Sequence, residues 1–133
     1  RIDLLPDAQR LPTTDYEWNR DGEAYQELRT LPFADARHHQ MLGYPSPIQN
    51  DDMELECQLA SHGIHVGNAD GIKDPRVADL KRGADDWKLL LQLDTDDDIG
   101  WMWGDVGTLY FWIREQDARS RDFSKVWMIS QCC

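Results

Sequence analysis

The feature that most constrains the fold is a set of three apolar segments in the last third of the chain. Residues 87–93 form an apolar run bounded by acidic residues, which is typical of a buried strand. Residues 107–113 are rich in aromatic and β-branched side chains, and residues 126–131 form a third segment of this kind. Three such segments with polar connections predict a sheet that is mainly antiparallel.

Helical patterns precede and interrupt these segments. Residues 51–61 begin with acidic side chains and favour a helix, while residues 77–82 and 115–121 predict shorter helical pieces. Nearer the N-terminus, we expect one short helix over residues 21–29 and another over residues 33–41 that ends near Gly43. The chain of 133 residues is long enough to bury a core. We therefore predict a single α+β domain over residues 1–133, with short helices and long loops.

The charge balance restricts the possible partners. The chain has 14 Lys and Arg residues against 25 Asp and Glu residues, giving a net charge of −11. This balance argues against binding to nucleic acid or to an anionic membrane surface, and favours a basic protein as partner. No apolar run is long enough to span a membrane. The three cysteines show no disulfide pattern or zinc-binding spacing, and no signal peptide is evident, so we expect a cytoplasmic location.

Two stretches of the sequence carry an uncommon series of residues in a fixed order. The first is HQMLGYPSPIQ at residues 39–49, which continues to Cys57-Gln58. The second contains LLLQLDTD at residues 89–96, MWGDVGTLYFWI at residues 102–113 and Gln131-Cys132. Together with Asp122-Phe123-Ser124, these stretches resemble the YwqG-like family of bacterial proteins, a domain family of unknown function. Members of that family are about twice as long, and this chain resembles their C-terminal half. The resemblance implies an α+β protein, supplies no activity, and leaves open a fragment, a proteolytic product or a short member.

The acidic segment that follows residue 93 is the first candidate site. Asp94, Asp96 and Asp98 have the alternating spacing with which a loop can present carboxylates to calcium. Ile99 and Asp105 stand where a calcium-binding hand has Gly and Glu. We therefore favour a solvated turn with no cofactor, and keep calcium binding as a minority hypothesis.

Two further segments carry candidate binding residues. Trp101, Trp103 and Asp105 can form a ligand or peptide pocket, although Trp103 and Trp112 are also suited to filling the core. In the second segment, Gly43 and two prolines make a rigid loop near His39, Tyr44 and Gln49. Recognition and a purely structural corner are both open for this loop.

Three classes of function fit these residues. We favour a non-enzymatic binding domain, for example an immunity-type protein that neutralises a basic toxin. The rival is a metal-assisted hydrolase or tailoring enzyme that uses Asp94, Asp96 and Asp105. In the third, the chain is a structural lobe whose unpaired edge strand favours self-association.

Overall fold

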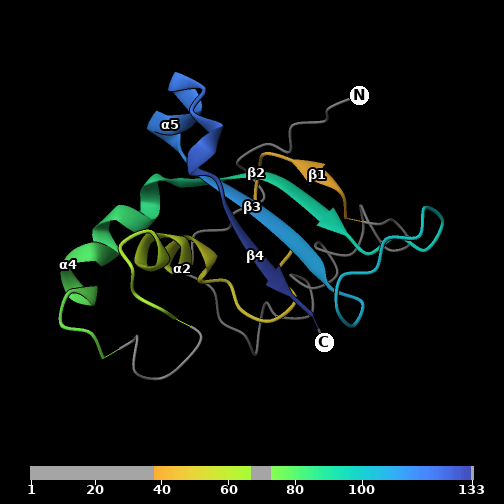
Figure 1. Cartoon of the computed structure of the whole chain (residues 1–133), viewed down its shortest axis with the longest axis horizontal. Coiled ribbons are helices and arrows are strands. Elements are labelled where there is room, and N and C mark those ends of the chain that lie inside the picture. The colour runs from red at the N-terminus through yellow and green to blue at the C-terminus, as the bar shows by residue number, and fades with distance from the viewer. Residues whose placement is uncertain (1–37, 67–72, 133) are drawn as a thin grey trace, which may run out of the picture.

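The computed structural model describes residues 38–66 and 73–132. The expected helix over residues 21–29 lies outside these residues, as do positions 33–37 of the second expected helix. The described residues form one antiparallel sheet with short helices at one end and on one face, as Figure 1 shows. The α+β class with an antiparallel sheet is confirmed.

The sheet has four strands in the order β1-β2-β3-β4. The strands are β1 (Gln40–Met41), β2 (Trp87–Asp94), β3 (Thr108–Arg114) and β4 (Trp127–Gln131). The three strands predicted from the apolar segments are thus present, with bounds within one residue of those expected. β2 and β3 form the long central pair, and their register shifts once between Leu89 and Leu91.

The helix expected over residues 33–41 is wrong at its end, where Gln40 and Met41 form β1. Gln40 pairs with Gln92 and Met41 with Leu91, so the edge of β2 decides the local conformation. Leu42 and Gly43 then adopt positive φ angles of 61° and 83°, which end the strand. A weak local helix preference is readily overridden by such tertiary pairing.

The helices follow the remaining sequence patterns. α2 (Met53–Ala60) lies within the predicted helix over residues 51–61. α4 (Val77–Leu80) continues into the 3-10 helix η3 (Lys81–Asp86), which leads directly into β2. α5 (Glu115–Ser120) and the 3-10 helix η4 (Phe123–Lys125) connect β3 to β4.

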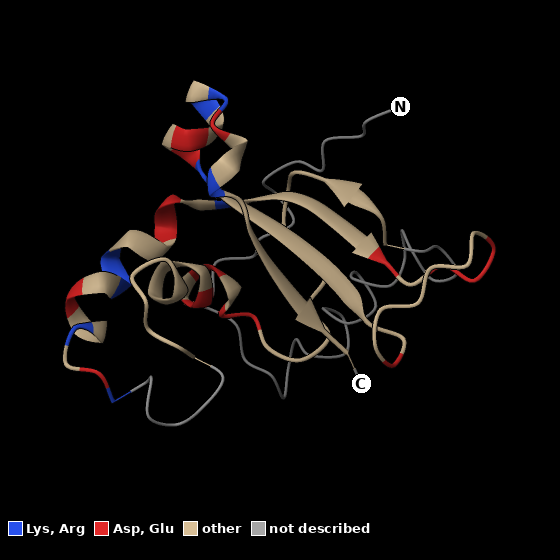
Figure 2. Cartoon of the chain, in the orientation of Figure 1, with Lys and Arg blue, Asp and Glu red and all other residues tan. Residues whose placement is uncertain are grey.

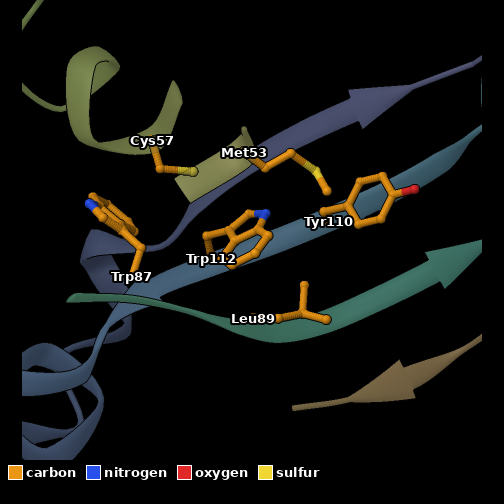
Figure 3. Packing of buried hydrophobic residues seen from close by; sticks show 6 residues of the cluster. All are labelled: Met53, Cys57, Trp87, Leu89, Tyr110 and Trp112. Atoms are coloured by element: carbon orange, nitrogen blue, oxygen red, sulfur yellow. The ribbon is translucent and has the colours of Figure 1, made fainter. Parts of the chain in front are cut away.

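The core lies between α2 and one face of the sheet. Figure 3 shows Met53 and Cys57 of α2 next to the strand residues Trp87, Leu89, Tyr110 and Trp112. These six side chains are at most 2% exposed. Trp112 therefore fills the core, which was one of the two functions considered for the tryptophans in the sequence analysis. Burial raises the pKa of the Cys57 thiol and that of the Tyr110 phenol above their usual ranges.

Candidate functional site

His39 lies immediately before β1, and both of its ring nitrogens have protein partners. The backbone N–H of Asp94 donates to Nδ1 at 3.1 Å, and Nε2 lies 3.1 Å from Oδ2 of Asp96. Because Nδ1 accepts a hydrogen bond, we assign the proton of the neutral ring to Nε2, which donates to Asp96. The carboxylate and the backbone together fix the orientation of the imidazole.

The chain beyond β2 forms a tight turn that holds Asp96 in place. The backbones of Asp96 and Trp101 exchange two hydrogen bonds, of 2.8 and 2.9 Å. The other carboxylate oxygen of Asp96, Oδ1, accepts the backbone N–H of Asp98 at 3.0 Å. One carboxylate therefore orients His39 and also shapes the loop, as short acidic side chains commonly do in turns.

The same turn brings Trp101 beside His39 and Trp103 beside Trp101. The ring of Trp101 meets the His39 ring edge-on, with centroids 6.1 Å apart and planes at 84°. The Trp103 ring lies 5.7 Å from that of Trp101, and its Nε1 donates to the carbonyl of Asp94 at 3.1 Å. Trp103 is half-buried, whereas Trp101 is 38% exposed. We call His39, Asp96, Trp101 and Trp103 the aromatic–acidic cluster.

The other expected site residues lie outside this cluster. Asp105 lies in an exposed turn between Trp103 and Gly107. Tyr44 is 37% exposed, and its carbonyl accepts Nε2 of Gln40 at 2.6 Å. Gln49 donates through Nε2 to the carbonyl of Cys132 at 2.6 Å. Gln49 thus connects the rigid loop to the end of β4.

Two buried glutamines, Gln92 and Gln131, were not among the expected site residues, and they hold the loop over residues 43–50 on the sheet. Gln92 accepts the N–H of Ser46 at 2.9 Å and donates to the carbonyl of His38 at 2.8 Å. Gln131 accepts the N–H groups of Ile48 and Gln49 and donates to the carbonyl of Asn50. A glutamine within an apolar strand segment was the available signal, because a buried amide needs partners.

Two of the carboxylates proposed as metal ligands, those of Asp94 and Asp96, accept hydrogen bonds from protein donors. Asp94 accepts hydrogen bonds from the hydroxyl of Thr108 and from the backbones of Thr95 and His38. Asp96 contacts His39 and Asp98, as described above. Within residues 38–66 and 73–132, no three His, Cys, Asp or Glu side chains gather as a metal site. The structure therefore does not bring Asp94, Asp96 and Asp98 together, nor Asp94, Asp96 and Asp105.

The charges around the cluster have one sign. The segment from Leu89 to Ile113 contains no Lys or Arg and five carboxylates, Asp94, Asp96, Asp97, Asp98 and Asp105. Figure 2 shows red without blue on the loops between β2 and β3, whereas blue appears around α4 and α5. We call the β2–β3 connection, residues 95–107, the acidic end of the sheet. Its potential attracts cations.

None of the helices within residues 38–66 and 73–132 has both the length and the apolar character of a membrane-spanning helix. No curated protein matches the chain with significant similarity. A family model does match, and it spans residues 4–132, almost the whole sequence. The chain therefore belongs to the family described as domain of unknown function DUF1963.

Proposed function

We propose that this chain is a non-enzymatic binding domain of the YwqG-like type, which receives a cationic group of a basic partner at the acidic end. The proposal rests on the exposed ring of Trp101, which lies in the same β2–β3 connection as the carboxylates of Asp96, Asp97, Asp98 and Asp105. An aromatic face attracts Lys or Arg through its quadrupole, and nearby carboxylates add Coulombic attraction. Such a pair of features suits recognition of a cationic side chain.

The hydrogen bonding of His39 favours binding over catalysis. A general base needs a nitrogen directed toward the proton that it removes. Both nitrogens of His39 contact protein groups, Asp94 N–H and Asp96 Oδ2. The ring serves in this arrangement as a support for Trp101.

One specific form of the proposal is an immunity-type protein that covers the basic surface of a nucleic-acid-directed toxin. The net charge of −11 supports it, because opposite charges accelerate the encounter of two proteins. If this form holds, co-expression of the chain protects cells from a basic toxin encoded nearby. Absence of protection would contradict the immunity role and leave the cation-binding surface to be tested directly.

The direct test is calorimetric titration of the chain with a hexa-arginine peptide, with a hexa-glutamate peptide as the negative probe. We expect the arginine peptide alone to bind, with an affinity that falls as salt is added. Trp101→Ala should weaken binding about tenfold, the effect of losing one to two kcal/mol of cation–π attraction.

Trp127→Ala is the matched control, because Trp127 is 39% exposed but lies at the start of β4. Equal losses in the two variants, or no binding of the arginine peptide, would overturn the proposal. Hydrolytic activity lost in Asp105→Ala with the fold intact would favour the rival enzyme.

A further inference from the structure

β4 is the outermost strand of the described sheet on the side away from β1, as Figure 1 shows. Its pairing with β3 runs without a bulge from Trp112↔Trp127 to Thr108↔Gln131. The sequence of the strand, WMISQ, contains no charge and no proline. Natural edge strands usually avoid unwanted pairing through lysines, prolines or bulges. β4 has none of these protections.

The outward backbone groups of β4 follow from the alternation of antiparallel hydrogen bonds. Thr95 N–H donates to the carbonyl of Gly107, which fixes the bonded pairs between β2 and β3. The backbone N–H and C=O groups of Thr108 therefore point toward Gln131. Because the direction alternates along a strand, Trp127, Ile129 and Gln131 are the residues of β4 that bond to β3. The N–H and C=O groups of Met128 and Ser130 therefore point away from the sheet. In the described part of the chain, no backbone group bonds to either residue from that side.

The side chains along this edge are accessible. Met128 is 51% exposed and Trp127 is 39% exposed, and Ser130 is also exposed. A partner strand here would gain backbone hydrogen bonds and would cover the side chains of Met128 and Trp127. Cross-strand pairs of this kind stabilise a sheet.

We infer that the partner strand is β4 of a second copy of this chain, paired antiparallel about a twofold axis at Ile129. In that register, Met128 of each copy lies opposite Ser130 of the other, so all outward backbone groups are paired. No like charges meet along the strand, because it is neutral. Such an isologous contact is the commonest form of protein dimer.

The distribution of charge also favours two antiparallel copies. β4 begins next to Lys125 of η4 and ends beside the turn at Gly107, at the acidic end of the sheet. Antiparallel pairing places the two acidic ends at opposite ends of the joined sheet, whereas parallel pairing would bring them together. The antiparallel dimer thus keeps the two acidic ends apart and leaves both aromatic–acidic clusters uncovered by β4.

The test is sedimentation equilibrium of the 133-residue chain over a range of concentrations up to roughly 100 µM. We expect a reversible dimer. Met128→Lys should raise its dissociation constant at least about tenfold, because two lysines would face the shared edge. Met102→Lys is the matched control, because Met102 is 52% exposed and lies at the acidic end. This control should dimerise as the wild type does.

Hydrogen exchange gives an independent measurement on the same samples. The amides of Met128 and Ser130 should become protected as the concentration rises, whereas that of Ile129, bonded to β3, is protected throughout. A monomer at every concentration would overturn the inference. A dimer insensitive to Met128→Lys, or equal dissociation in both variants, would overturn it as well.

Discussion

Gln131 at the end of β4 accepts the backbone N–H of Ile48 at 2.8 Å, although 83 residues separate them in sequence. The same side chain also contacts Gln49 and Asn50, and it is only 2% exposed. The side-chain amide of Gln131 therefore forms the hydrogen bonds with the backbone of the loop before α2 that a neighbouring strand would otherwise form. The position of that loop depends on it.

Gln131→Leu should lower the free energy of unfolding by about 1–3 kcal/mol, because the loop groups lose their partner within the protein. Gln49→Ala, which removes one exposed hydrogen bond to Cys132, should cost less than about 1 kcal/mol. Urea unfolding of both variants measures the difference. Equal losses would show that the loop does not depend on the buried amide.

Gly107→Ala should destabilise the protein by about 2–3 kcal/mol through overpacking. A Cβ atom there would lie 2.4 Å from the carbonyl oxygen of Gln131 and 2.5 Å from that of Trp103, and neither backbone atom can easily move. Gly100→Ala provides the control: its Cβ meets open space, and its φ of +74° alone costs about 1 kcal/mol. Thermal unfolding followed by near-ultraviolet circular dichroism compares them, and a larger loss at Gly100 would contradict the packing argument.

Arg114→Lys should cost about 1–2 kcal/mol of stability. The Arg114 guanidinium lies 4.6 Å from the centroid of the Trp87 ring and donates to Gln58 and Ser61 at 3.0 and 2.8 Å. A lysine cannot reproduce this planar contact. Arg119→Lys, which alters an exposed pair with Glu115 within α5, should change stability by less than about 0.5 kcal/mol. Similar values for the two variants in urea unfolding would show that the contacts of Arg114 are weak.

Alkaline pH should destabilise the fold. Burial raises the pKa of Cys57 above its ordinary value of 9.0, and that of Tyr110 above 10.0. Above these ordinary values the unfolded chain releases protons that the folded chain retains, so stability present below pH 9 falls as the pH rises. Each group contributes a slope of up to about 1.4 kcal/mol per pH unit.

Cys57→Ala separates the two groups. The substitution leaves a cavity that lowers stability at every pH, but it also removes the loss caused by the thiol. Urea unfolding between pH 7 and pH 10 should therefore show a shallower decline in Cys57→Ala than in the wild type. An identical decline would mean that the thiol ionises in the folded protein as easily as in the unfolded chain.

The centre of the fold could be predicted from the sequence. The segments that form β2 and β3 are apolar and largely buried, and the aromatic and β-branched residues of the segment that forms β4 favour a strand although most of its side chains are exposed. The helix α2 was predicted from the acidic residues at the start of residues 51–61, which favour a helix N-terminus. β1 was not predictable, because two residues carry no periodic signal and their strand conformation comes from pairing with β2.

The candidate site shows the same division. The sequence singled out His39, Trp101 and Trp103 by residue type, but it could not show that they meet, whereas Tyr44, Gln49 and Asp105 lie elsewhere. His39 and Asp96 are 57 residues apart and come together because β1 pairs with β2. The sequence pattern of a segment indicates which of its side chains are buried. Only tertiary structure decides which segments become neighbours, because that choice depends on hydrogen bonds and packing between distant parts of the chain.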